Sequence, residues 1–159
     1  MAEPSKYISK NDAYLKLRTY CAYQERCHSE VRTKLISLKI YGDDLEEVIA
    51  DLIQDNFLDE ERFARAFARG KFRIKKWGKY KITQELKRKR VSEYCIKKGL
   101  SEIDQEEYLA TAKELLTKYY DKLSGIDPIK RKKTYEHGAR KGYESFVIND
   151  ILNALRKSK

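Results

Sequence analysis

The sequence predicts an all-α protein made of three tandem three-helix repeats in an elongated, curved, right-angle-type helical array. Three observations lead to this prediction. Apolar residues recur at helical spacing along most of the chain, five of these positions repeat at a nearly constant offset, and alternating strand patterns with Asn-Gly or Asp-Gly turns are absent. Only two prolines and seven glycines interrupt 159 residues, which leaves long stretches for helix.

The repeat is visible as apolar positions that return about once every fifty residues. The first and second sets are offset by 51 residues: Val31, Leu35, Ile40, Leu45 and Leu52 against Ile82, Leu86, Val91, Ile96 and Ile103. A third set follows at an offset of 52 and is degenerate at its first two positions: Thr134, Gly138, Tyr143, Ile148 and Leu155. A fixed period of this kind indicates units that complete their cores against their neighbours, although any helical chain can match itself at five positions.

Capping and breaking residues set the expected helix boundaries. The first helix of each repeat is expected at 12–24, 59–77 and 104–123. Ser and Asp side chains suit helix N-caps, glycine interrupts a helix, and proline suits the first helical turn. The expected caps and breaks are, in chain order, Ser29, Gly42-Asp43-Asp44, Asp59, Gly78, Ser92, Ser101, Ser124-Gly125 and Asp127-Pro128.

These boundaries divide the chain into four parts. We expect a flexible N-terminal segment at 1–11, a first repeat at 12–57, a basic second repeat at 58–103 and a third repeat at 104–159.

Charge is separated along the chain. Residues 43–61 carry nine acids and no base, whereas residues 69–90 carry eleven Lys/Arg and one acid. The formal net charge of the whole chain is +10. A clustered positive surface favours a polyanionic partner, nucleic acid first, while a lysine-rich composition that only maintains solubility is the alternative. We interpret the acidic stretch as an exposed helix face, with mimicry of DNA phosphates or contact with basic loops of a partner as the alternative.

The basic block is the main candidate for contacts with a protein partner or DNA. At 3.6 residues per turn its cations cannot share one face, so we expect them to surround a helical corner, either as contacts or as a solvated surface. Trp77 is interpreted either as a packing residue between repeats or as a stacking platform for bases. The candidates are Arg69, Lys71, Arg73, Lys75, Lys76, Trp77, Lys79, Lys81, Lys87, Arg88, Lys89 and Arg90.

A second basic cluster lies in the third repeat. A curved array could align it with the first block along one concave surface. Its members are Lys130, Arg131, Lys132, Lys133, Arg140 and Lys141.

Neither an enzyme, a metal site nor a cofactor is expected. Cys21, Cys27 and His28 lack further ligands at metal-site spacing, and nothing links His28 or His137 to an activated Ser or Cys. A phosphate-binding Gly-x-x-x-x-Gly-Lys-Ser/Thr loop is absent. The cysteines look like reduced thiols, and neither a signal peptide nor a membrane-spanning apolar run is visible, so a cytoplasmic protein is expected. The basic surface favours a monomer.

Four segments resemble, in order, the motifs of one known family. They are Arg26-Cys27-His28-Ser29-Glu30-Val31 with Lys34-Leu35; Asp55-Asn56-Phe57-Leu58-Asp59-Glu60-Glu61-Arg62-Phe63-Ala64; Trp77-Gly78 with Lys81-Ile82 and Glu85-Leu86; and Lys141-Gly142-Tyr143. Over most of residues 12–157 the chain resembles the RecX family of bacterial regulators of the RecA recombinase. The chain departs from the family pattern at three positions: Asn56 and Arg90 replace glycines, and Gly138 replaces a leucine.

The resemblance implies three tandem three-helix repeats and a function without catalysis. Family members bind along the groove of the RecA nucleoprotein filament and inhibit it, and some bind DNA. The implied function is negative modulation of RecA in recombination, DNA repair and the SOS response, through the basic second repeat and the last repeat. A helical DNA-binding module or transcription regulator, and a scaffold for an unrelated acidic protein, remain as alternatives.

Overall fold

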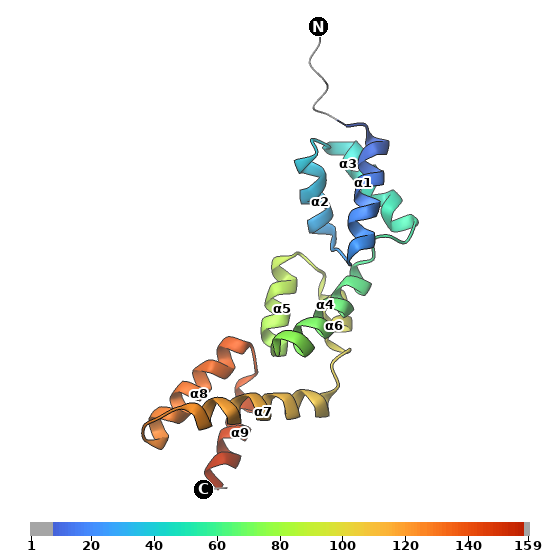
Figure 1. Cartoon of the computed structure of the whole chain (residues 1–159). Helices are drawn as coiled ribbons and strands as arrows, with labels where there is room; N and C mark the ends of the chain where they lie inside the picture. The colour runs from blue at the N-terminus through green and yellow to red at the C-terminus, as the bar shows by residue number, and fades with distance from the viewer. Residues whose placement is uncertain (1–7, 158–159) are drawn as a thin grey trace.

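The structure, a computed structural model, describes the backbone of residues 8–157, which is helical apart from the short connections (Figure 1). Residues 1–7 of the expected flexible segment 1–11 lie outside the described residues, and the first helix already begins at Lys10. The helices of the described part are α1 (Lys10–Tyr23), α2 (His28–Ser37), α3 (Gly42–Gln54), α4 (Glu60–Lys75), α5 (Lys79–Arg88), α6 (Glu93–Leu100), α7 (Gln105–Lys122), α8 (Asp127–Lys141) and α9 (Ser145–Lys157).

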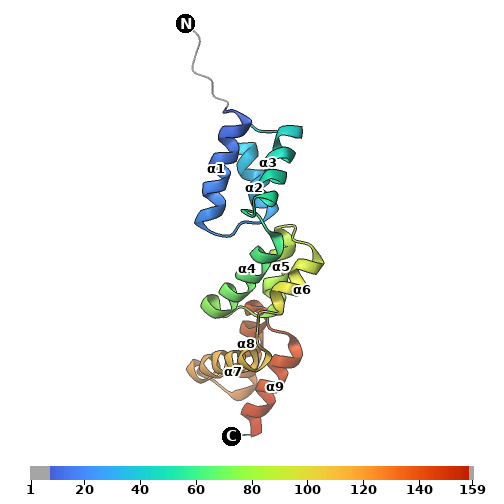
Figure 2. The same cartoon turned by 90° about the vertical axis from the view of Figure 1, so that its right-hand side faces the viewer.

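The helices group in threes, as the sequence predicts. Repeat 1 is α1–α3, repeat 2 is α4–α6 and repeat 3 is α7–α9, and helices pack mainly against others of their own group. The three repeats follow one another along the molecule, with α1 and α9 toward opposite ends (Figures 1 and 2). The prediction of an all-α, elongated array of three tandem repeats is therefore confirmed.

The same backbone turn marks the end of the second helix in every repeat. Lys39, Arg90 and Gly142 have φ values of 66°, 63° and 96°, in the left-handed region. The N–H of the next residue bonds, at 3.0 Å each time, to a carbonyl five residues back, in the pairs Ile40–Leu35, Val91–Leu86 and Tyr143–Gly138. These turns are spaced by 51 and 52 residues, so the backbone repeats at the offsets found in the sequence.

Arg90 stands where this turn favours glycine, which gives a stability prediction. A left-handed conformation costs an L-residue about 1 kcal/mol or more, whereas glycine adopts it freely. We expect Arg90→Gly to raise the free energy of unfolding by about 1 kcal/mol in urea denaturation. Gln84→Gly, in the exposed middle of α5, is the matched control and should lower it by about 1 kcal/mol. A loss of stability on Arg90→Gly would contradict this account of the turn.

The apolar core has two parts. Repeat 1 encloses one cluster, which includes Leu17, Leu35 and Leu52. Repeats 2 and 3 enclose a single continuous cluster, which includes Ile82 and Tyr108 and also receives Cys27 from repeat 1. Repeats 2 and 3 are thus joined by a shared apolar core, to which repeat 1 contributes the Cys27 side chain.

The degenerate positions of repeat 3 are filled by neighbouring side chains. A Cβ on Gly138 would lie 3.0 Å from Ile148 and 3.2 Å from Leu116 of α7, so these two side chains occupy the space of the missing leucine. Thr134 is buried, and its hydroxyl donates to the Lys130 carbonyl at 2.8 Å. Repeat 3 is therefore packed like the other two despite its altered sequence.

Several expected boundaries are confirmed. The carboxylate of Asp59 accepts the Arg62 N–H at 2.9 Å, and the Ser92 hydroxyl accepts the Cys95 N–H at 3.2 Å. Gly78 separates α4 from α5, and Pro128 lies in the first turn of α8. Side-chain capping and the missing proline N–H explain why these positions could be recognised.

Other cap predictions are wrong. Cys27, not Ser29, precedes α2, and Ser29 lies inside the helix. Ser101 ends α6 instead of starting a helix, and Asp104 caps α7 by accepting the Glu107 N–H at 3.0 Å. At 42–44 the residues Gly-Asp-Asp form the first turn of α3, where carboxylates favour the positive end of the helix dipole without a side-chain cap.

Candidate partner interface

The joint between repeats 2 and 3 brings two glycine turns into direct contact. The Gly78 N–H donates to the Lys141 carbonyl at 2.7 Å, and the Tyr80 N–H donates to the Gly142 carbonyl at 2.9 Å. A Cβ on Gly142 would lie 2.2 Å from the Cβ of Lys81, so the backbones touch without room for a side chain. The joint thus brings Trp77-Gly78 and Lys141-Gly142-Tyr143, which are far apart in the sequence, into contact.

The buried Tyr108 side chain connects repeats 2 and 3 at the same joint. Its hydroxyl accepts the Lys79 N–H at 2.9 Å and donates to the Glu144 carboxylate. Burial, together with Glu144, raises the pKa of Tyr108 well above the ordinary tyrosine value, so the phenol stays neutral and remains a donor. The Tyr143 ring lies 5.2 Å from that of Tyr108, centroid to centroid. Repeats 2 and 3 are therefore held in one arrangement by apolar and polar contacts together.

The joint between repeats 1 and 2 is largely polar. The Ser29 hydroxyl donates to the Lys89 carbonyl at 2.7 Å, and the His28 N–H donates to the Glu60 carboxylate at 2.9 Å. The guanidinium of Arg62 pairs with Glu25. The Arg62 side chain therefore acts across the joint, while its backbone N–H donates to the Asp59 cap.

The structure divides the basic block between the two joints. Lys75 and Lys81 lie at the repeat 2–repeat 3 joint, where the Lys141 ammonium donates to the Lys75 carbonyl at 3.2 Å. Arg88 and Lys89 lie at the other joint, where they line a depression together with residues of α2. The cations thus surround α4 and α5, which agrees with the expected helical corner.

Several cations of the block are already paired. Arg69 lies 3.6 Å from Glu102, Lys89 lies 3.5 Å from Glu30, and Arg88 lies 3.0 Å from Glu85. Across residues 8–155, whose side chains are described, five exposed cations of the block have no carboxylate within ion-pair distance: Arg73, Lys75, Lys76, Lys87 and Arg90. These five are the cations of repeat 2 that are most available to a partner.

Trp77 packs within repeat 2. It is half-buried, and its ring meets that of Phe67 edge-on at a centroid distance of 6.4 Å. The ammonium groups of Lys71 and Lys81 lie 5.1 and 4.6 Å from the centre of its ring. Stacking of a base on Trp77 would require one of these lysines to move, so its role as a stacking platform stays a prediction and its packing role is the one visible in the structure.

Two of the six cations in the second basic cluster contact other residues of repeat 3. The Arg131 side chain is only 12% exposed and donates to the Leu152 carbonyl at 2.5 Å, which holds α8 against α9. The Lys130 ammonium lies 4.1 Å from the centre of the Tyr120 ring. Arg131 was expected to line a surface with the rest of its cluster, but its side chain is mostly buried because its guanidinium binds the Leu152 carbonyl inside α9.

The rest of that cluster lies at the two ends of α8. Lys132 and Lys133 are exposed near its start, whereas Arg140 and Lys141 end the helix beside repeat 2. At 1.5 Å per residue the two ends are about 12 Å apart. Only the Arg140–Lys141 end is therefore contiguous with the basic block, and alignment of the whole cluster along one surface stays a prediction.

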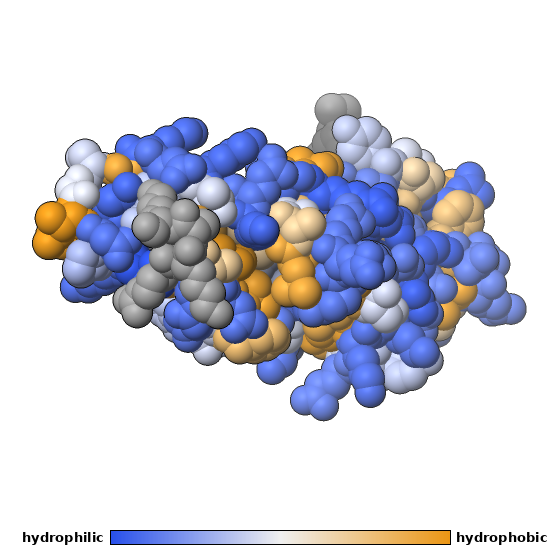
Figure 3. Space-filling view, turned by 90° about the horizontal axis from the view of Figure 1, so that it is seen from below, coloured by the Kyte–Doolittle hydropathy of each residue, from blue (hydrophilic) through white to orange (hydrophobic). Residues whose placement is uncertain are grey.

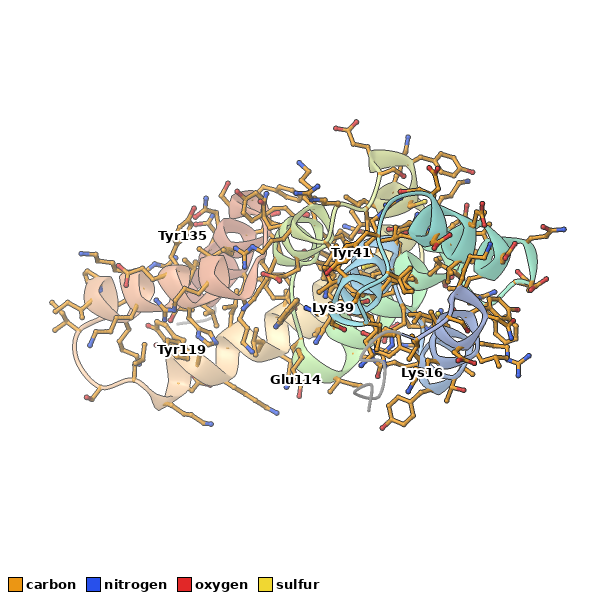
Figure 4. All side chains as sticks on the ribbon, turned by 90° about the horizontal axis from the view of Figure 1, so that it is seen from above. Lys16, Lys39, Tyr41, Glu114, Tyr119 and Tyr135 are labelled. Carbon is orange, nitrogen blue, oxygen red and sulfur yellow. The ribbon has the colours of Figure 1, made fainter. Side chains whose placement is uncertain are left out.

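The acidic face of α3 is exposed and partly neutralised within repeat 1. Glu46 pairs with Arg32 at 2.6 Å and Glu47 pairs with Lys10. Figure 4 labels Lys16 of repeat 1, which lies well apart from Tyr119 and Tyr135 of repeat 3. The exposed face of α3 agrees with our interpretation for residues 43–55, whereas the Glu60 side chain in the first turn of α4 is only 13% exposed and accepts the His28 N–H.

The described residues show neither a group of three or more His, Cys, Asp and Glu side chains that could hold a metal ion nor a helix long and apolar enough to cross a membrane.

Burial raises the pKa of the Cys21 thiol to about 11, and it also raises the pKa of the Cys27 thiol. Both thiols are therefore protonated at neutral pH and act as packing groups.

One surface was missed at the sequence level. Ile74 follows Phe63 and Phe67 at helical spacing, and it is 78% exposed. Phe63, Phe67, Gly70 and Ile74 form a line along α4, which we call the α4 stripe. Figure 3 shows apolar patches on one mostly hydrophilic face of the molecule. A glycine inside a basic helix, on the same side as three apolar residues, was the available signal.

Comparison with known proteins identifies the family. Family models described as the second and third three-helix domains of RecX match residues 59–100 and 105–152. The regulatory protein RecX of Chlorobium phaeobacteroides is 34% identical over 136 residues, which cover 84% of this chain and 88% of that protein. The chain belongs to the RecX family.

Other RecX proteins differ in length. The regulatory protein RecX of Prosthecochloris aestuarii is 31% identical and is covered to 88% of its length. That of Lactobacillus johnsonii is 30% identical but is covered to only 56% of its length. The crystal structure of RecX from Lactobacillus salivarius superposes with a TM-score of 0.83 at 23% identity, covering 92% of this chain and 96% of that one, which supports the shared fold.

Proposed function

We propose that this protein binds the RecA recombinase–DNA filament and lowers its activity, acting by binding and not by catalysis. Membership of the RecX family is the observation that carries the proposal. The arrangement of charge supports it, because exposed cations without carboxylate partners surround the middle repeat of an elongated molecule. The proposal places the protein in the cytoplasm as a monomer, in the setting of recombination, DNA repair and the SOS response.

The proposed mechanism is steric and electrostatic. Cations at both joints of repeat 2 attract a negatively charged filament and raise the rate of encounter. The stacked repeats then occupy the filament groove and contact neighbouring protomers or the DNA, so that an incoming strand is blocked. Because repeats 2 and 3 share one core, they engage as a unit.

The test is DNA-dependent ATP hydrolysis by the cognate RecA, titrated with the full-length protein at moderate salt. We expect inhibition at amounts well below one molecule per RecA protomer, because a regulator of a filament affects many protomers at once. Inhibition that requires enough protein to coat the DNA would indicate competition for DNA instead. Absence of inhibition at any ratio would refute the proposed function.

A DNA-binding module is the second candidate, favoured by the same unpaired cations. Phosphate contacts would dominate such binding, so the affinity would fall steeply with salt. Fluorescence anisotropy with a labelled single-stranded oligonucleotide and a duplex separates the two candidates. Strong, sequence-dependent duplex binding without an effect on RecA would support the DNA-binding module.

A further inference from the structure

We propose that the α4 stripe, rimmed by Lys71, Arg73 and Lys75, is a docking site for an acidic protein segment that carries an aliphatic or aromatic anchor side chain. The inference rests on the proposed function only in assigning this segment to the RecA filament. Its chemistry follows from α4 itself and is tested without that assignment.

The first observation is that α4 has two apolar faces. Ala64, Ala68 and Phe72 are buried on one face, where a Cβ on Gly99 of α6 would lie 2.6 Å from the Ala64 carbonyl oxygen and the Phe72 ring lies 5.8 Å from that of Tyr108 in α7. The α4 stripe lies about 130° away around the helix, at 100° per residue. A helix that only packs against its own domain needs one apolar face. The start of the second face belongs to the core, because Phe63 is buried and Phe67 packs against the same cluster, but its far end at Ile74 is exposed and requires another explanation.

Exposure increases along the stripe. Phe63, near the repeat 1 joint, is buried, Phe67 is half-buried, and Ile74 at the far end is 78% exposed. The stripe thus continues from the core onto the surface and ends in an aliphatic side chain that this chain leaves in water. An apolar side chain in this position gains contact area only when something else covers it.

The surface along the stripe is hollowed. One depression of about 210 Å³ is lined by Ala66, Phe67, Gly70, Lys71, Ile74 and Lys75. A second, of about 380 Å³, shares Ala66, Phe67 and Lys71 and extends to repeat 1. A Cβ on Gly70 would meet no atom within 4 Å, so the small residue keeps the groove open without being needed for packing.

The rim of the groove is positive. Lys71 and Lys75 flank the stripe on one side and Arg73 on the other, by their positions on the helix. In residues 8–155 none of the three lies within ion-pair distance of a carboxylate. The carboxylates at the repeat 1 end, Glu25 and Glu30, are already paired with Arg62 and Lys89. The groove is therefore complementary to a segment rich in Asp or Glu.

The lining favours protein over nucleic acid. A single strand offers phosphates and bases, and bases need free aromatic faces on which to stack. The Phe67 ring already has the ammonium groups of Lys71 and Lys89 at 5.5 and 5.9 Å from its centre. The aliphatic surface of Ala66 and Ile74 matches an apolar amino-acid side chain better than a phosphodiester backbone. Apolar anchors with a charged rim are the usual composition of protein docking sites.

The probe is a fluorescently labelled peptide of glutamates that carries one Leu and one Phe, measured by anisotropy with the full chain. Ile74→Gln should weaken binding about tenfold, since it removes the aliphatic side chain without changing charge. Ile53→Gln, at a similarly aliphatic but acidic exposed site on α3, should change binding by less than about twofold. A peptide with Ser in place of Leu and Phe should bind weakly to all three proteins, and salt should weaken every interaction.

The outcomes separate this inference from the proposed function. If Ile74→Gln binds the peptide like the parent protein, the docking site is wrong. The docking site is also wrong if Ile74→Gln weakens only oligonucleotide binding, because the stripe would then bind DNA. It is likewise wrong if Ile74→Gln abolishes a self-association detected by sedimentation, because the stripe would then bind a second copy of the chain. If the parent protein inhibits RecA and Ile74→Gln inhibits equally well, the assignment to the filament fails while the proposed function stands. If peptide binding depends on Ile74 but RecA is unaffected by the parent protein, the docking chemistry stands and the proposed function fails.

Discussion

Replacing Gly78 with alanine is expected to lower the free energy of unfolding by about 3 kcal/mol, the upper range for an overpacked site. The new Cβ would lie 2.3 Å from both the carbonyl carbon and the carbonyl oxygen of Gly142, and 2.5 Å from the Tyr143 nitrogen. All three are backbone atoms, so no side chain can rotate away. The two backbones would have to separate, and this would lengthen the 2.7 Å hydrogen bond from Gly78 to Lys141.

The loss of stability should come from more than the contact at Gly78 itself. Separation of the two backbones would also lengthen the 2.8 Å hydrogen bond from the Tyr143 hydroxyl to the Lys76 carbonyl. Because repeats 2 and 3 share one core, we expect them to lose stability together, in a single transition followed by circular dichroism in urea. A Gly78→Ala protein that unfolds within about 0.5 kcal/mol of the parent would contradict the direct backbone contact.

Gly70→Ala is the matched control for this substitution. Gly70 lies in the interior of α4, and a Cβ there meets nothing within 4 Å. Alanine should therefore stabilise the protein by about 0.5–1 kcal/mol, since glycine in a helix loses more backbone entropy on folding. Opposite signs at two glycines eight residues apart would show that the contact, and not the loss of glycine itself, determines the effect at Gly78.

Much of the fold could be predicted from the sequence because buried apolar positions recur at a nearly fixed interval along the chain. Ile82 and Leu86 recur 51 residues after Val31 and Leu35, and all four are buried at the same places in their repeats. The degenerate third set could not be understood in this way. Gly138 makes sense only when Leu116 from another helix is seen to fill its space, and a periodic pattern contains no information about neighbours across the core.

The candidate site was less predictable than the fold. The block of cations was evident in the sequence, but which of them are free depends on contacts between distant residues. Ser29 holds the Lys89 carbonyl across 60 positions, and Glu30 takes the Lys89 ammonium. Likewise the Arg131 guanidinium donates to the Leu152 carbonyl. Hydrogen bonds and ion pairs of this kind depend on tertiary structure, whereas helical spacing reveals only partners within about one turn of the same helix.

Reversing the charges of Lys87 and Arg88 is expected to raise the concentration of protein needed to inhibit RecA about tenfold or more at low salt. Both side chains are exposed at the end of α5, and Lys87 has no carboxylate within ion-pair distance in residues 8–155. Lys89 is left unchanged, because its pairing with Glu30 supports the joint between repeats 1 and 2. The variant Lys87→Glu/Arg88→Glu therefore alters the surface while it preserves the fold.

The control is Lys16→Glu/Lys113→Glu, which makes the same change in net charge on exposed parts of α1 and α7, outside both basic clusters. Long-range attraction alone would make the two variants equally weak inhibitors, since it depends on total charge. Contact at the end of α5 predicts a large effect for the first variant and a change of about twofold or less for the second. Raising the salt concentration should narrow the gap, because screening removes the attraction that the exposed cations provide. Equal inhibition by both variants would exclude Lys87 and Arg88 from the interface and direct attention to the cations at the joint between repeats 2 and 3.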